Sequence, residues 1–395
     1  MILLRNVRLI PQLTPGFSGE RGDVLIQDKH IKAIVPPGEG QAEHAVDLSG
    51  CTLLPGLIDA HVHLDLCGMN TFEENTQPDS YRTLRALSLA QSSLRQGYTT
   101  LRDLGDRNNV ILSLARAIEE GLCQGPSLLA SGRILSPTEA GNEFFGSMYR
   151  QADSPKEFRR GVRKQHQAGA KWIKVMVTGA VMNPGGEPGQ PILLEKELQA
   201  LVQAARRLSL PVAAHCHGAE GIKMAIKAGV RTVEHSTLMD KECIALYQKA
   251  AGRVFPIPTL SPLFRFSRFP QGQPAHYVEK ANRYRDAMVS SLALAKEAGI
   301  KMGFGTDAGV YEGSHGNGIY EFRCRVEEAG FTPLECLLQA TLHNAQILGI
   351  DHLVGTIEPG KWADLVAFPG QPDLQIDHLE KPAFVMKQGC IVPLS

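Results

Sequence analysis

Short apolar runs alternate with longer segments of helical period along most of the chain, beginning near residue 57. Runs of this kind, bounded by turn residues, are typical of strands buried on both faces of a parallel sheet. Eight such runs occur, the number of strands in a closed (β/α)8 TIM barrel, and we predict that α/β fold. The predicted strands are residues 57–63, 98–104, 127–133, 171–178, 211–217, 231–235, 254–258 and 301–307.

Two of the intervening segments begin with clear helix start signals. Ser154 is an N-cap residue, followed by Pro155 at the first helical position and Glu157 at the third. Thr332 opens the same arrangement, and the amphipathic run that follows it ends at Gly349. Helices between successive strands are the crossovers that a parallel barrel requires.

The two ends of the chain differ from its middle. Residues 1–56 predict short strands, with a hairpin signal at the turn residues 28–30. The strand-like pattern returns after about residue 354. We therefore predict one small β domain formed by residues 1–56 and 355–395, which brackets a barrel of residues 57–354.

Composition fits a globular protein and limits the choice of partners. The 395 residues are 43% apolar and 21% charged, and Lys+Arg and Asp+Glu both number 41. Because no basic field attracts nucleic acid or anionic lipid, a small-molecule enzyme or a protein-binding module is favoured. The oligomeric state stays open, with a homo-oligomer as one option.

The sequence also favours a cytoplasmic protein. The apolar run near the first residue is too short and too interrupted for a signal peptide. The sequence has no run of about 18 apolar residues that would predict a membrane span. Eight cysteines are scattered without a CxxC pair. Such spacing suits reduced, buried thiols better than a disulfide framework.

Candidate metal ligands follow the predicted strands. His61 and His63 end the first strand, and because residues two apart share a face, both imidazoles can reach one site. His215 closes the fifth strand, His235 the sixth and Asp307 the eighth. Each alone fits a satisfied core side chain, but together they lie at the barrel end where active sites gather, and they predict a metal site there.

Lys174 lies within an apolar run that a barrel would bury. An unpaired ammonium is costly in a low dielectric, and burial favours the neutral amine. A neutral amine can add carbon dioxide to form a carbamate, an anionic ligand able to bridge two cations. The alternatives are a lysine that reaches the barrel rim or pairs with a carboxylate.

This set of residues resembles the amidohydrolase superfamily in its binuclear, lysine-bridged form. The neighbourhood is similar to the imidazolonepropionase/prolidase-like branch, which includes dipeptidases and carboxypeptidases. The matching segments run nearly the whole length of the chain and are LPGLIDAHVHL (54–64), GYTTLRDLG (97–105), KVMVTGAVMNPG (174–185), AAHCHGAEGIKMAIKAGVRTVEH (213–235), GFGTDAG (303–309) and VGTIEPGKWADLVAF (354–368). The family's β-sandwich, built from both termini, agrees with the small β domain.

The resemblance implies a complete metal centre and a mechanism. It implies two divalent cations, for which zinc is the default with this histidine-rich set. His61, His63 and Asp307 would bind one ion, His215 and His235 the other, and N-carboxylated Lys174 would bridge them. A metal-bridging hydroxide would attack an amide carbonyl, with Asp307 as general base and acid.

Three further residues are candidates for substrate contacts. His217 shares a face with His215, and relatives often place Tyr or His there, so we predict a catalytic residue that could hydrogen-bond the substrate carbonyl or carboxylate. His315 lies in a glycine-rich loop after the eighth strand, and Arg265 follows the seventh, where a guanidinium could pair with a carboxylate. A structural role is the alternative for each. The segment after the third strand departs from the dipeptidase pattern, and places Glu139 and Glu143 where it can face the substrate.

The predicted function is hydrolysis of an amide C–N bond in a small molecule, such as a dipeptide, an N-acyl amino acid or a similar carboxamide. A cyclic amide, lactam or amidine hydrolase of the same superfamily, or a deaminase, is the first alternative. Lys174 argues against the deaminases, whose usual site holds one metal. A binding protein that has lost its chemistry is the second alternative, and the complete ligand set argues against it.

Overall fold

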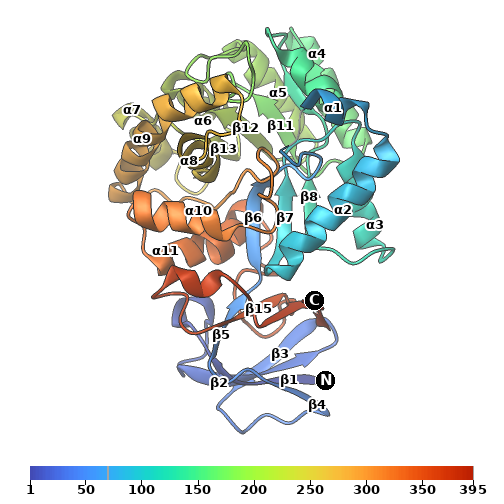
Figure 1. Cartoon of the computed structure of the whole chain (residues 1–395), viewed down its shortest axis with the longest axis vertical. Helices are drawn as coiled ribbons and strands as arrows, with labels where there is room; N and C mark the ends of the chain where they lie inside the picture. Colours follow the sequence, from blue (N-terminus) through green and yellow to red (C-terminus); the bar gives the residue numbers. More distant parts are fainter. Residues whose placement is uncertain (69–70, 395) are drawn as a thin grey trace.

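The computed structural model describes residues 1–68 and 71–394, without the side chains of residues 71 and 72. Figure 1 shows a barrel surrounded by helices and, below it, a sheet that contains both ends of the chain. This arrangement confirms the predicted α/β barrel fold. The exact domain boundaries at residues 56 and 355 stay a prediction.

Most of the predicted barrel strands form parallel ladders. The first three strands pair in the order β6-β7-β8 and the next four in the order β11-β12-β13-β14. Short strands β9 (Ile134–Ser136) and β10 (Tyr149–Gln151) extend the wall beside β11. The barrel strands are β6 (Leu57–Val62), β7 (Tyr98–Asp103), β8 (Ser127–Ala130), β11 (Ile173–Met176), β12 (Val212–Cys216), β13 (Thr232–His235) and β14 (Phe255–Ile257).

The eighth predicted strand, residues 301–307, is not a regular strand, although it closes the barrel. The Phe304 carbonyl accepts a backbone bond from β6 at 3.0 Å. The N–H of Phe304, however, donates to Asn344 Oδ1 at 3.0 Å, and that of Thr306 donates to Asp59 Oδ1 at 3.1 Å. Because side chains take these donors, a regular ladder does not form.

Helices cover the outside of the barrel (Figure 1). As predicted, Ser154 caps its helix through Glu157 N at 3.3 Å, and Thr332 forms a capping box with Glu335. The helix after Thr332 includes a π-helical segment, Gln339–His343, and ends at Gly349 with φ 74°. The α-helices are α1 (Thr71–Thr76), α2 (Asp79–Arg95), α3 (Val110–Glu119), α4 (Pro155–Gln167), α5 (Glu195–Arg207), α6 (Ala219–Ala228), α7 (Lys241–Lys249), α8 (Ser261–Arg268), α9 (Ala275–Glu297), α10 (Ile319–Arg323), α11 (Pro333–Leu338) and α12 (Asn344–Leu348).

The sheet below the barrel joins the two ends of the chain. Its strand order is β17-β16-β15-β5-β1-β2-β3, with β4 paired to β1. The N-terminal β5 runs antiparallel to the C-terminal β15, and Leu53 lies opposite Ala367. The strands are β1 (Ile2–Arg8), β2 (Arg21–Gln27), β3 (His30–Val35), β4 (His44–Asp47), β5 (Cys51–Pro55), β15 (Leu365–Pro369), β16 (Phe384–Lys387) and β17 (Cys390–Ile391).

One apolar core extends from the barrel into the terminal sheet. Leu101 and Ile173 of the barrel belong to the same large buried cluster as Val366 of the sheet, whereas Leu4 and Met386 belong to a smaller cluster within the sheet. Burial of such side chains supplies the main favourable free energy of folding. None of the described helices is both long and apolar enough to cross a membrane.

Candidate metal centre

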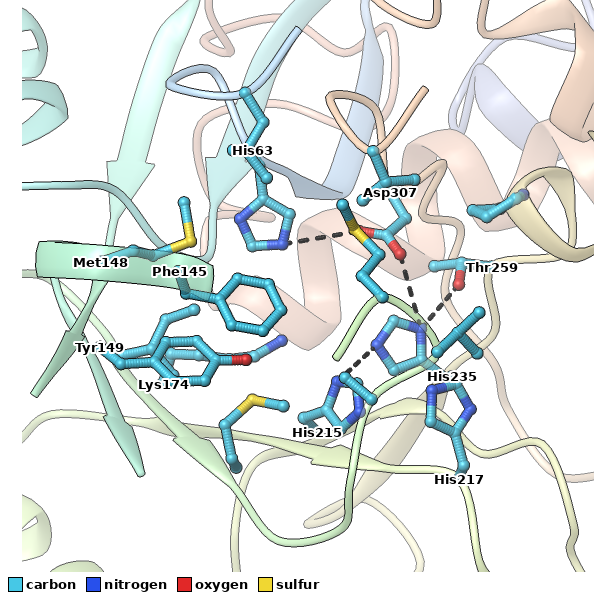
Figure 2. Close-up of a pocket in the computed structure, with 18 of the residues that line it drawn as sticks. His63, Phe145, Met148, Tyr149, Lys174, His215, His217, His235, Thr259 and Asp307 are labelled. Carbon is cyan, nitrogen blue, oxygen red and sulfur yellow. Dashed lines mark hydrogen bonds and ion pairs between the residues drawn. The ribbon is translucent and has the colours of Figure 1, made fainter. Parts of the chain in front are cut away.

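The six predicted metal ligands meet at the C-terminal end of the barrel. Five of them border one cavity, and the sixth, His61, is fully buried beside them. Figure 2 shows the five lining side chains pointing toward one another from the barrel strands and the segments that follow them. The five are His63, Lys174, His215, His235 and Asp307.

His61, His63 and Asp307 form a first cluster. Nε2 of each histidine lies 3.5 Å from Asp307 Oδ1. Ligand atoms around a tetrahedral zinc ion lie roughly 3.3 Å apart, given metal–ligand bonds of about 2.0 Å. The cluster therefore has the donor types and the spacing that a divalent cation requires.

His215, His217 and His235 form a second cluster. Their candidate ligand atoms all lie within 4.8 Å of one another, and His235 Nε2 is 3.0 Å from His215 Nδ1. His235 Nδ1 also lies 4.0 Å from Asp307 Oδ2 of the first cluster. The two clusters therefore belong to one site.

Lys174 projects from β11 into the same site. Its Nζ lies 3.4 Å from His61 Nε2, and the side chain borders the cavity together with His215 and His235. The residue is only 1% exposed, which excludes the alternative of a lysine at the barrel rim. Burial lowers the pKa of the amine to about 8.

Each of the five clustered imidazoles has one ring nitrogen engaged by an oxygen atom. These contacts are His61 Nδ1 to Glu234 Oε2 (2.8 Å), His63 Nδ1 to Gly105 O (3.1 Å), His215 Nε2 to Gly179 O (3.1 Å), His217 Nδ1 to Thr237 Oγ1 (2.7 Å) and His235 Nδ1 to Thr259 Oγ1 (2.8 Å). Metal-binding histidines almost always have such a partner on the nitrogen that does not coordinate. The donor set therefore fits divalent cations.

A buried ion pair holds His61 in place. Arg102 Nη2 lies 3.0 Å from both carboxylate oxygens of Glu234, and both side chains are fully buried. Glu234 in turn contacts His61 Nδ1. The sequence interpretation missed this pair, although each member is a charged residue in an apolar strand, the same signal that pointed to Lys174.

Burial sets the protonation of the clusters. It lowers the pKa of His63 and of His217 to about 3, and lowers that of His61, His215 and His235 well below the ordinary value. Neutral imidazole is the form that binds a metal. Burial also raises the pKa of Asp307 to about 7, a shift that a bound cation would oppose.

Two of the candidate ligands have left-handed backbones. His235 has φ 65° and Asp307 has φ 55°. Such conformations cost about 1–3 kcal/mol in a residue other than glycine and concentrate at functional sites. The Asp307 N–H donates to the His61 carbonyl at 2.8 Å, which fixes the turn that directs its carboxylate into the site.

The model of the amidohydrolase family matches residues 52–394. The chain belongs to the amidohydrolase family. It is 30% identical to ochratoxinase of Aspergillus niger over 410 residues, which cover 97% of this chain and 81% of that protein. The structure of an Xaa-Pro dipeptidase with bound methionine matches at TM-score 0.89 and 31% identity, and that of a prolidase complexed with N-methylphosphonate-L-proline at TM-score 0.88 and 30% identity, with 99% of both chains covered in each case.

These similarities confirm the predicted prolidase-like branch of the amidohydrolases. The chain is therefore an enzyme, a hydrolase that acts on carbon–nitrogen bonds. The alternative of a binding protein without chemistry is not supported.

Of the three candidate substrate contacts in this amidohydrolase, the structure brings only His217 to the cavity. His315 is buried outside the cavity lining, where its Nε2 donates to the Leu66 carbonyl at 3.0 Å. The guanidinium of Arg265 stacks over the Phe269 ring at 4.5 Å and is also absent from the lining. Neither position supports a direct substrate contact.

The loop after the third strand supplies apolar rather than acidic groups to the cavity. Glu139 bonds Asn183 at 3.2 Å, and Glu143 is exposed outside the lining. Instead, Phe145, Met148 and Tyr149 border the cavity. The sequence interpretation missed all three, although large apolar side chains in a loop indicate that these side chains are buried.

Proposed function

We propose that this amidohydrolase cleaves an amide C–N bond of a small molecule with the help of two divalent metal ions. The observation that supports this proposal most strongly is that two clusters of ligand-type side chains lie at a single cavity, with buried Lys174 beside them. A dipeptide, an N-acyl amino acid or a similar carboxamide would supply the bond. The donor set of imidazoles and one carboxylate favours zinc.

In this proposal each cluster holds one ion. His61, His63 and Asp307 would bind the first, and His215 and His235 the second. The neutral amine of Lys174 would add carbon dioxide, forming an N–C bond and losing a proton, and the resulting carbamate would bridge the ions. When bound, the ions would acidify a water molecule and polarise the amide carbonyl.

Two side chains of the protein would then act on the substrate: Asp307 would transfer a proton, and His217 would bind the carbonyl oxygen. Asp307 would take the proton of the attacking water and deliver it to the nitrogen of the leaving amine as the C–N bond breaks. His217 would hold the substrate carbonyl. When Thr237 donates to His217 Nδ1, the imidazole proton lies on Nε2, which can donate to that oxygen.

Metal analysis and amine release test this proposal on purified, zinc-loaded protein. We expect two ions per chain and release of free amine from at least one member of a panel of dipeptides, N-acyl amino acids, carboxamides and lactams. The His61→Ala variant should lose metal and activity, whereas His166→Ala, at an exposed helical position, should keep both. Near-zero metal would contradict the proposal, and one ion per chain would favour the deaminase-like alternative.

A further inference from the structure

Apart from the candidate metal ligands, His217 and Thr259, the cavity lining is largely apolar and forms an apolar wall. This wall includes Leu66, Phe145, Met176, Met182 and Phe266, which come from separate parts of the chain. The Phe145 and Tyr149 rings stack with centroids 4.5 Å apart and an interplanar angle of 14°. Figure 2 shows this pair beside Lys174, across the cavity from His235. Aromatic and thioether side chains bind flat apolar groups well.

Apart from Lys174 of the metal centre, no arginine or lysine is among the described lining residues to pair with a substrate carboxylate. Lys280 lies behind the segment that contains Met182, but its ammonium donates to the carbonyls of Ala180, Asn183 and Gly186. Arg133 donates to the Tyr149 carbonyl at 2.6 Å. Lys280 Nζ and Arg133 Nη2 are therefore bonded to backbone carbonyls, and neither residue belongs to the described cavity lining.

A substrate ammonium group would also lack an oppositely charged partner in the cavity. Apart from Asp307, no aspartate or glutamate is among the described lining residues. Glu139 bonds Asn183, and Glu187 pairs with Arg283 at 3.1 Å outside the cavity lining. A zwitterionic dipeptide would therefore bury both of its end charges without an oppositely charged side chain beyond those of the metal centre, which is unfavourable.

We propose that the site takes uncharged amides with an aryl or similarly large apolar group, packed on the Phe145–Tyr149 stack. This inference rests on the amide hydrolysis proposed above and selects among its substrates. A free carboxylate near the scissile bond, as in a dipeptide or an N-acyl amino acid, weakens a substrate because the apolar wall cannot compensate its charge.

The local backbone explains how the aromatic platform is built. Gly146 follows Phe145 with φ 53° and ψ −132°, and this reversal lets Phe145 and Tyr149 present stacked rings. A Cβ atom at Gly146 would lie 2.6 Å from Asn75 Oδ1. The loop after the third strand therefore acts as a specificity element.

Three matched substrates test the inference on zinc-loaded protein. They are the phenylacetyl amides of phenethylamine, of L-phenylalanine and of L-phenylalaninamide, which share the scissile bond and both rings. We expect kcat/KM to be at least tenfold higher for the two neutral amides than for the carboxylate. The third compound controls for the size of the added group.

The outcomes separate this inference from the proposed function. Equal or faster cleavage of the carboxylate, or cleavage of dipeptides alone, overturns the neutral-amide inference while amide hydrolysis stands. Failure to cleave these amides and every member of the panel described above, with two metals bound, overturns both.

Variants of the wall give a second test. Phe145→Ala should raise KM for the neutral amides about tenfold while the metal content stays unchanged. Met182→Arg should move the preference at least tenfold toward the carboxylate, whereas Leu122→Arg, at a position 76% exposed, should leave it unchanged. An unchanged preference in a folded, metal-loaded Met182→Arg protein would argue against the inference.

Discussion

Lys174 is buried 3.4 Å from His61 Nε2, and its removal should affect metal and activity together. We expect Lys174→Ala to lower kcat/KM by more than about a hundredfold, since even residues that only orient ligands matter by about 10- to 100-fold. Metal content should fall in parallel, with partial rescue by short carboxylic acids that can occupy the position of the carbamate. Turnover and metal content are the measurements.

Lys171→Ala is the matched control, because Lys171 is exposed and lies just before the same strand. It should retain full activity and metal. A Lys174→Ala protein with unchanged turnover would refute the bridging role.

The burial of His315 should make the stability of the protein depend on pH in the acid range. Its pKa is lowered by burial to about 4, from an ordinary value of 6.5. The unfolded chain therefore takes up a proton near pH 6.5 that the folded chain refuses until about pH 4. The free energy of unfolding should decrease as pH falls through this window, by up to about 3 kcal/mol from this residue.

The variant His315→Gln can still donate to the Leu66 carbonyl but does not titrate. Melting temperatures of the metal-free proteins between pH 6.5 and 4.5 should therefore fall less steeply for this variant than for the wild type. His166→Gln, at an exposed position, should follow the wild-type curve. Parallel curves for wild type and His315→Gln would contradict the prediction.

Individual ligands could be predicted from the sequence because each is a polar residue in an apolar strand. Lys174 is the clearest example. Arg102 and Glu234 give the same signal, but they are 132 positions apart, and only the closed barrel shows that they pair. The position of the Phe145 ring depends on the backbone of Gly146, which local sequence alone does not determine.

Asn344 joins the segment that closes the barrel to β6. Its Nδ2 donates to the carbonyls of Ile58 and Phe304, each at 2.8 Å, and its Oδ1 accepts from Phe304 N. Asn344→Ala would leave the Phe304 N–H without its acceptor and would remove a donor from each of the two carbonyls. We expect a loss of about 2–4 kcal/mol in the free energy of unfolding, measured by denaturant titration.

Lys301→Ala is the control for this prediction. It removes only an exposed bond from Lys301 Nζ to Gln346 Oε1, at the start of the same segment. Its effect should stay within about 0.5 kcal/mol. A comparable loss in the two variants would show that Asn344 has no special part in closing the barrel.

The strands and helices could be predicted best where hydrophobic period and capping agree. The helix that begins after Ser154 has both signals, and the structure confirms it. Residues 301–307 have the apolar pattern of a strand, but the side chains of Asn344 and Asp59 accept hydrogen bonds from two of its backbone N–H groups. Those side chains come from distant parts of the chain, so a local pattern does not reveal them.

Metal removal should destabilise the whole molecule, because the candidate ligands come from strands around the entire barrel. A ligand that binds only the folded state at a concentration 1,000 times its Kd adds about 4 kcal/mol of stability. We expect a chelator to lower the Tm by several degrees, and added zinc to restore it. Calorimetry of the His61→Ala protein should show little response to either treatment. An unchanged Tm in the wild type would argue against a resident metal.

The overall architecture could be predicted because eight apolar runs and two strand-rich ends define it together. The cavity that selects the substrate could not, since Phe145, Met182 and Phe266 reach it from separate segments. The sequence therefore indicates the chemistry more readily than the molecule on which it acts.

The pairing of β5 with β15 also has a consequence for synthesis. Leu53 meets Ala367, which leaves the ribosome roughly 300 residues later, on the order of 15–60 s at typical elongation rates. Throughout that interval the apolar edge of β5 lacks its native neighbour and is open to other chains. A nascent chain that stalls before β15 would therefore be prone to aggregate, whatever the state of its metal site.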